Sequence, residues 1–216
     1  MEKSNIILAS SSPRRIEMMR EHGIDPVIIK PSCSETLPPG TKMEDAVLFL
    51  SLKKALSVEQ NFLADAFLQE KTVSPHPYII AADTIVYQNG IIGKPKDKED
   101  AFAILRRLAA SDHFVATGVT ILQVGLPLRR SFCEITKVTF RDYTDEMLLR
   151  YIHTDEPYDK AGGYAIQGTF GQYVERIEGD RNNVIGFPWN RISAEFADLT
   201  GHSLSQSTTT AGFRKE

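Results

Sequence analysis

Short apolar runs alternate along this chain with segments whose apolar residues recur at helical spacing. Runs rich in Ile, Val and Ala are typical of strands buried on at least one face, whereas spacings of three and four residues indicate helices. We expect strands at residues 5–10, 26–30, 78–86, 113–124, 128–140 and 172–177. We expect helices at residues 13–22, 97–108 and 144–152, and a mostly helical segment at residues 43–69. Residues 183–199 begin with Asn-Val-Ile-Gly-Phe-Pro-Trp and are expected to continue as a helix. Strands and helices are therefore interspersed, and no internal repeat is visible.

The stretch from Tyr78 to Pro95 combines an apolar strand with charged residues. Asp83 lies inside the apolar run, where a carboxylate loses hydration and must find a cation or hydrogen-bond donors, or shift its pKa. Asn89-Gly90 is a strong signal for a two-residue hairpin turn, and the return strand that starts at Ile91 brings Lys94 back toward Asp83. A structural salt bridge and a functional site both remain open for this pair.

A hydroxyl-rich segment, Ser10-Ser11-Ser12-Pro13-Arg14-Arg15, joins the first strand to the first helix. Ser12 suits the N-cap and Pro13 suits the first helical position. Free backbone N–H groups and the helix dipole favour an anion at such a helix start. Arg14 and Arg15 add guanidinium groups whose geometry suits phosphate. The alternative is a capped helix with two solvated arginines.

Three further segments, a loop, a helix and a glycine-rich stretch, carry charged residues of candidate function. The loop at residues 31–42 contains Glu35, and Lys53 and Lys54 interrupt the apolar pattern of the long helix that follows. One of these lysines could turn inward, although solvated lysines are more common. Residues 155–168 combine charged residues with glycines, which permit close backbone approach and positive φ. An ordinary glycine-rich turn explains this last segment equally well.

Composition narrows the classes of function. The chain has 216 residues, of which 42% are hydrophobic and 25% charged, as in ordinary globular proteins of one large domain or two lobes. A net charge of −3 argues against nucleic acid as a partner, and a small polyanion would need a local cationic cluster or a metal. No apolar run is long enough for a membrane span, so no membrane partner is expected. Cys33 and Cys133 form no metal or disulfide pattern, which favours a cytoplasmic location.

Several motifs, in this order along the chain, resemble those of the Maf family of nucleoside triphosphate pyrophosphatases. Each motif is weak alone, but the ordered set is specific and extends from about residue 6 to residue 192. The matching segments are residues 8–15, 82–86, 93–95, 113–119, 156–168 and 183–188.

The resemblance implies an elongated α/β fold of two lobes, with a mixed sheet flanked by helices and a central cleft, similar to inosine triphosphate pyrophosphatases. We expect a single catalytic domain over residues 1–202 and a disordered tail at residues 203–216. The implied reaction is cleavage of a nucleoside triphosphate to the monophosphate and pyrophosphate. The implied cofactor is a divalent cation, with Mg²⁺ favoured over Mn²⁺, and the implied assembly is a homodimer.

Three positions resemble the subgroup of the family that acts on dTTP and UTP. Arg14, Thr84 and Gln167 match that subgroup, whereas members acting on 7-methyl-GTP tend to carry other residues at these positions. Modified pyrimidine nucleotides are equally plausible substrates. The alternative function is a nucleotide-binding regulator of cell division that has no turnover.

The resemblance also implies roles for individual residues. Asp83 would accept a proton from the attacking water or orient it, Lys94 would neutralise the leaving pyrophosphate, and Glu35 would join Asp83 in holding the cation. Lys160 would face the phosphates, with a pair to Asp159 or Glu156 as the competing interpretation. The residues expected to bind substrate are Ser10, Arg14, Arg15, Lys54, Thr84, Lys160 and Gln167.

Overall fold

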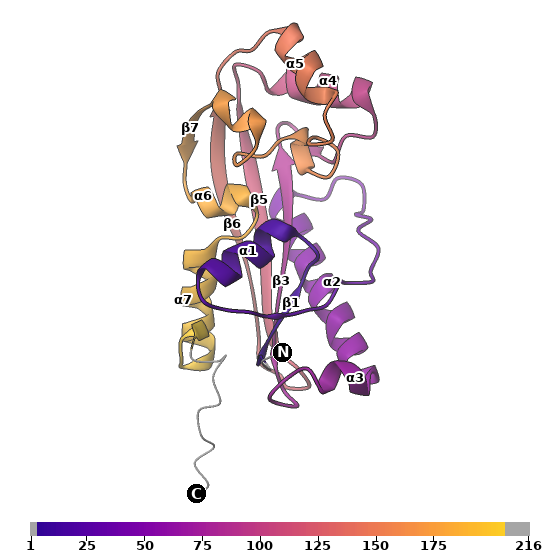
Figure 1. Ribbon diagram of the computed structural model, residues 1–216, viewed down its shortest axis with the longest axis vertical. Helices are drawn as coiled ribbons and strands as arrows, with labels where there is room; N and C mark the ends of the chain where they lie inside the picture. Colours follow the sequence, from indigo (N-terminus) through magenta and orange to yellow (C-terminus); the bar gives the residue numbers. More distant parts are fainter. Residues whose placement is uncertain (1–3, 206–216) are drawn as a thin grey trace, which may run out of the picture.

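The computed structural model describes residues 4–205, which form an elongated α/β protein around one mixed sheet (Figure 1). Seven strands are present in the order β2-β1-β3-β5-β6-β7, with β4 also paired to β3. The strands are β1 (Ile6–Ala9), β2 (Val27–Ile28), β3 (Tyr78–Tyr87), β4 (Ile91–Ile92), β5 (Asp112–Gln123), β6 (Arg129–Phe140) and β7 (Val174–Glu178). The helices are α1 (Pro13–Glu21), α2 (Met43–Ala64), α3 (Ala66–Gln69), α4 (Lys98–Leu108), α5 (Asp145–Ile152), α6 (Arg181–Ile185) and α7 (Trp189–Thr200), with short 3₁₀ helices at Ala161–Gly163 and Thr169–Tyr173. The expected fold class is confirmed.

Helices cover both faces of the sheet, and the alternation of side chains along β3 serves both layers. Ile79 and Ala81 pack with α2 on one face. Ile80 and Ala82 belong to the larger core on the other face, which is closed by α1, α4, α5, α6 and α7. Because successive strand residues point to opposite faces, Asp83 lies on the α2 face and Thr84 on the opposite face.

Gly118 lets α2 lie unusually close to the sheet. A Cβ atom at this position of β5 would stand 2.1 Å from the carbonyl oxygen of Val47, which no side chain tolerates. One turn further along α2, the Ser51 and Thr120 hydroxyls are 3.1 Å apart and hydrogen-bonded. This close packing places the next turn of α2, which carries Lys54, beside the middle of β3.

Two of the expected helical segments contain a break that was not expected. Residues 43–69 are helical except at Asp65, which ends α2 and whose carboxylate then accepts hydrogen bonds from N–H groups of α3. The helix expected within residues 183–199 is α7, and the short α6 precedes it and ends at Gly186, which has the left-handed conformation with φ of 105°. Pro188 then precedes the start of α7.

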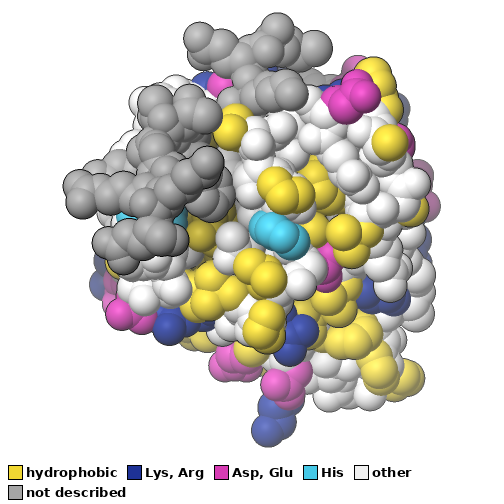
Figure 2. All heavy atoms as spheres, turned by 90° about the horizontal axis from the view of Figure 1, so that it is seen from below, with side chains coloured by type: hydrophobic (Ala, Val, Ile, Leu, Met, Phe, Trp, Pro, Cys, Tyr) yellow, Lys and Arg dark blue, Asp and Glu magenta, His cyan; other side chains and the backbone are white. Residues whose placement is uncertain are grey.

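The two ends of the molecule lie away from the middle of β3. At the lower end, apolar side chains are interspersed with charged and polar ones (Figure 2). Leu204 is buried in the core, and residues 206–216 of the expected tail lie outside the described residues. None of the helices in residues 4–205 has the length and hydropathy of a membrane span.

Candidate functional site

The candidate site lies at a gap along one edge of β3. Because β5 pairs with β3 from Tyr78 to Tyr87, both β1 and β4 must pair with the opposite edge. The β1 pairing ends at Ala81 and the β4 pairing begins at Val86. Residues 82–85 therefore face no described strand on that edge, and Asp83, Thr84 and Ile85 of this gap line a cleft.

Two adjoining cavities, of about 450 and 300 Å³, occupy this cleft. The larger one has the size of a small-molecule site. Asp83, Thr84 and Lys160 line the larger cavity, and Ser10 lines the smaller one, as does Lys30, which sequence reasoning missed. Both cavities share the side chains of Ser12, Arg14, Arg15, Glu35, Lys54, Lys94 and Asp159. The structure thus brings together nine of the ten predicted site residues.

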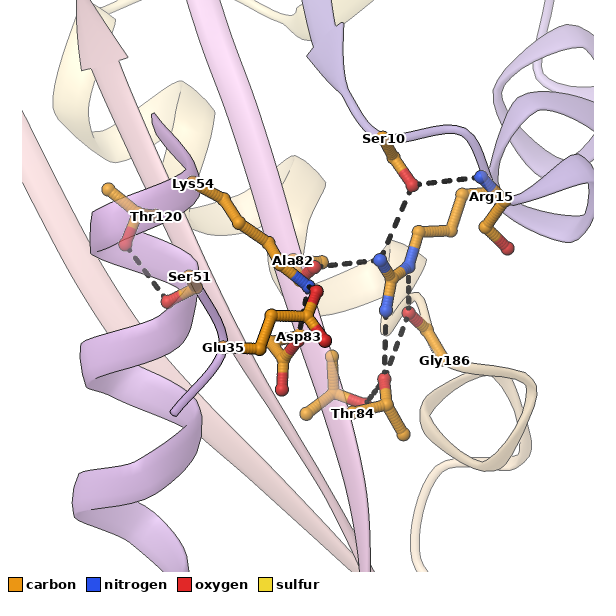
Figure 3. Close-up of polar contacts among 12 residues, drawn as sticks. Ser10, Arg15, Glu35, Ser51, Lys54, Ala82, Asp83, Thr84, Thr120 and Gly186 are labelled. Atoms are coloured by element: carbon orange, nitrogen blue, oxygen red, sulfur yellow. Dashed lines mark hydrogen bonds and ion pairs between the residues drawn. The ribbon is translucent and has the colours of Figure 1, made fainter. Parts of the chain in front are cut away.

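Lys54 lies between the two carboxylates that were expected to hold the cation (Figure 3). Its Nζ atom is 2.5 Å from Asp83 Oδ1 and 2.7 Å from Glu35 Oε1. The side chains of Lys54 and Asp83 are 13% and 10% exposed, whereas that of Glu35 is 56% exposed. The hydrogen bond from Lys54 lowers the pKa of Glu35, against the opposing effect of partial burial. The inward-turning lysine that the sequence left open is therefore Lys54.

Glu35 and Asp83 also fit a Mg²⁺ site that a substrate completes. Mg²⁺ in nucleotide enzymes takes one or two carboxylates, and phosphate oxygens and waters supply the remaining ligands. Within residues 4–205, no group of three or more His, Cys, Asp or Glu side chains gathers around a common point. The protein side of such a site would therefore be these two carboxylates, an all-oxygen donor set that suits Mg²⁺.

Arg15 connects three segments of the site through its guanidinium group (Figure 3). Nε donates to the carbonyl of Gly186 at 2.8 Å, and Nη1 donates to that of Ala82 at 2.7 Å. Nη1 is also 3.4 Å from Ser10 Oγ, and Nη2 donates to Thr84 Oγ1 at 3.0 Å. Burial lowers the pKa of Arg15, an effect that nearby carboxylates oppose. This arginine, expected as a phosphate clamp, is engaged with acceptors of the protein itself.

A buried hydroxyl and amide network holds α6 against the sheet. The hydroxyls of Thr84 and Thr117 are 2.9 Å apart, and Thr117 donates to the carbonyl of Asn183 at 3.2 Å. The Asn183 amide donates to the carbonyl of Val115 at 3.0 Å. A Cβ atom on Gly186 would lie 3.1 Å from Thr84 Oγ1, so a glycine is needed for this close approach. The network presents the end of α6 as one wall of the larger cavity.

The N-terminus of α1 opens onto the smaller cavity. Ser12 occupies the N-cap position and Pro13 the first helical position, as expected, but the Ser12 side chain makes no capping bond. Instead, the backbone N–H of Ser12 donates to Ser10 Oγ at 3.1 Å. Arg14 lines both cavities. The helix start and Arg14 together offer N–H donors and positive charge to an anion.

Two further lysines, Lys94 and Lys160, line the cleft. Lys94 is exposed and lines both cavities, because the β3–β4 hairpin turns at Asn89 and Gly90 with positive φ at both residues. Lys160 donates to the carbonyl of Glu156 at 2.6 Å and forms an ion pair with Asp159. The competing pair for Lys160 is thus formed, although the residue also lines the larger cavity.

Gln167 stands apart from the other predicted site residues. Its side chain is exposed, and it is not among the residues that line either cavity. Sequence reasoning also missed the apolar lining of the larger cavity, which includes Val115, Tyr164, Val184 and Ile185. These residues carry no distinguishing signal, because apolar positions on a strand or a helix have the pattern of ordinary core.

Comparison with known proteins identifies the family of this chain. The family described as "Maf-like protein" matches residues 5–199. A dTTP/UTP pyrophosphatase of Geobacillus sp. (strain WCH70) is 43% identical over 196 residues, which cover 90% of this chain and 97% of that protein. A dTTP/UTP pyrophosphatase of Caldicellulosiruptor bescii is 41% identical over 202 residues, covering 92% and 96% respectively. A match over almost the whole chain, together with relatives at this identity, shows that the chain belongs to the Maf family.

Proposed function

We propose that this protein hydrolyses dTTP and UTP to the nucleoside monophosphate and pyrophosphate. The observation that carries the proposal is a single cleft at the start of α1 that holds two carboxylates, those of Asp83 and Glu35, beside several lysine and arginine side chains. The names of the similar proteins from Geobacillus and Caldicellulosiruptor support the choice of nucleotides. Modified forms of these pyrimidine nucleotides would fit the same chemistry.

The smaller cavity suits the phosphates and the larger one suits the nucleoside. A triphosphate carries about four negative charges, and Arg14, Lys30 and Lys94 line the smaller cavity beside the N-terminus of α1. The larger cavity adds the apolar wall formed by Val115, Tyr164, Val184 and Ile185, against which a pyrimidine ring can pack. Thr84 lines the larger cavity, where it would offer a hydroxyl to the substrate.

Asp83 is the residue best placed to handle the proton of the attacking water. Its carboxylate is almost buried and fixed by Lys54, so its orientation is set before substrate arrives. The anhydride bond between the α- and β-phosphates breaks, one water molecule is consumed, and Asp83 accepts the proton that the water loses. Lys94, which lines both cavities, neutralises charge on the departing pyrophosphate.

Glu35 and Asp83 would hold a divalent cation, which we propose to be Mg²⁺. When bound, the cation would neutralise phosphate charge and orient the phosphate oxygens. Two free cysteines, Cys33 and Cys133, support the cytoplasm as the compartment, because free thiols persist in reducing surroundings.

Pyrophosphate release from a nucleotide panel tests the proposal. We expect dTTP and UTP to be turned over in preference to CTP, ATP and 7-methyl-GTP, with activity lost in a chelator and restored by Mg²⁺. Direct binding of dTTP is measured in parallel by calorimetry. Tight binding of dTTP without any release of pyrophosphate would favour the regulator without turnover and refute the enzyme.

A further inference from the structure

Lys54 occupies the position at which a divalent cation bound by Glu35 and Asp83 would lie. An ion held by both carboxylates sits about 2.1 Å from each oxygen when it is Mg²⁺. The ammonium nitrogen is already 2.5 Å and 2.7 Å from the same two side chains (Figure 3). An ion and the ammonium group cannot share this space, and their like charges repel each other. One of the two must therefore leave when the other is present.

The structure lets the ammonium group move while its helix stays in place. The preceding turn of α2 is fixed to β5 by the hydrogen bond between Ser51 and Thr120, at 3.1 Å. Lysine carries its charge on a flexible four-carbon stem, so Nζ can change partners without movement of the backbone. Lys54 also lines both cavities, and phosphate oxygens in the smaller one would offer it a new anionic partner.

We propose that Lys54 is an internal counter-cation that keeps the divalent ion out of the nucleotide-free protein. The ion then binds only together with the nucleotide, whose phosphates draw the ammonium group away from Glu35 and Asp83. This inference rests on the proposed function, because it takes the nucleotide as the ligand that displaces Lys54. It goes further in assigning an order to the binding of the two ligands.

Binding of Mn²⁺ to the nucleotide-free protein tests the inference without any turnover. The concentration of free Mn²⁺ is measured by electron paramagnetic resonance during titrations of the wild type and of three variants, Lys54→Met, Lys54→Arg and Lys53→Met. Lys53 is the matched control, because it is the adjacent lysine of α2 and its Nζ lies over the ring of Phe49 instead. The wild type is also titrated with a non-hydrolysable α,β-methylene analogue of dTTP.

We expect Lys54→Met to bind Mn²⁺ at least tenfold more tightly than the wild type, because removal of the ammonium frees both carboxylates. Lys54→Arg and Lys53→Met should stay near the wild type, and adding Asp83→Asn to Lys54→Met should remove the gain. In the wild type, the analogue should raise the affinity for Mn²⁺ by at least tenfold.

Equal Mn²⁺ affinity of the wild type with and without the analogue would overturn the inference, whether or not Lys54→Met folds. So would a folded Lys54→Met protein that binds Mn²⁺ no better than Lys53→Met. These results depend on nucleotide binding but not on turnover. If the protein fails to release pyrophosphate from dTTP and UTP while the analogue and Lys54→Met both tighten Mn²⁺ binding, hydrolysis is refuted and the role of Lys54 stands.

Discussion

Replacement of Arg15 separates a structural role from a role in binding phosphate. The guanidinium group donates to the carbonyls of Ala82 and Gly186 and to the hydroxyls of Ser10 and Thr84, so it joins the β1–α1 loop, β3 and the end of α6. If this bracing is its main role, Arg15→Met should lower stability strongly.

The size of the expected stability loss follows from the acceptors that lose their hydrogen-bond donor in Arg15→Met. The hydroxyl of Thr84 keeps its hydrogen bond to another threonine, and Ser10 Oγ still accepts from a backbone N–H. The carbonyls of Ala82 and Gly186 lose a charged donor, at about 1–3 kcal/mol for each. The sum is roughly 3 kcal/mol, because some water will reach the vacated space. In a protein of this size, about 1 kcal/mol shifts the melting temperature by about 2–4 °C, so we expect a fall of about 6–12 °C.

Thermal and urea unfolding of Arg15→Met, Arg15→Lys and Arg14→Met provides the measurement. Arg15→Lys keeps the charge but cannot reach several acceptors with one planar group, so it should recover only part of the lost stability. Arg14→Met should change stability by about 0.5 kcal/mol or less and raise KM for the nucleotide instead. An Arg15→Met protein that melts like the wild type but no longer releases pyrophosphate would refute the bracing role and identify Arg15 as a phosphate ligand.

Three other substitutions have expected outcomes. Asp83→Asn should reduce pyrophosphate release by about 10²–10⁴-fold while circular dichroism shows an intact fold; turnover close to the wild type would remove Asp83 as the base. Burial lowers the pKa of His113 from 6.5 to about 4. The unfolded chain therefore binds the extra proton first, and the unfolding free energy should fall by up to about 3 kcal/mol as pH drops from 6.5 through 4. His113→Gln should flatten this dependence in urea unfolding, and an unchanged slope would contradict the assignment. Gly162→Ala should lower both the melting temperature and turnover, since its Cβ would lie 2.9 Å from Val86 at φ of 72°. Gly23→Ala has a similar φ of 78° with open space around it, so an equal loss there would show that backbone strain alone is responsible.

Local signals predicted most of the elements, because hydrophobic periodicity, turn residues and helix starts act over a few residues. The Asn89-Gly90 hairpin and the strand–loop–helix around Ser12 are in the expected places. The break at Asp65 was missed, because the apolar pattern continues on both sides of it, and α6 was missed because it has only five residues. The sequence also does not distinguish adjacent residues of the same type. Lys53 lies over an aromatic ring, whereas Lys54, one position further along α2, turns into the site.

The site itself depends on strand register, which local patterns do not contain. The apolar run around Asp83 is continuous, and nothing in it shows that β1 pairs only as far as Ala81 or that β4 begins pairing at Val86. These two limits leave the edge of β3 open at residues 82–85, and the gap gives Arg15 access to the Ala82 carbonyl. Side-chain alternation at the gap then sends Asp83 toward Lys54 on one face and Thr84 toward Arg15 on the other. One interruption in the pairing of a single strand edge therefore accounts for both the carboxylate–lysine centre and the arginine brace.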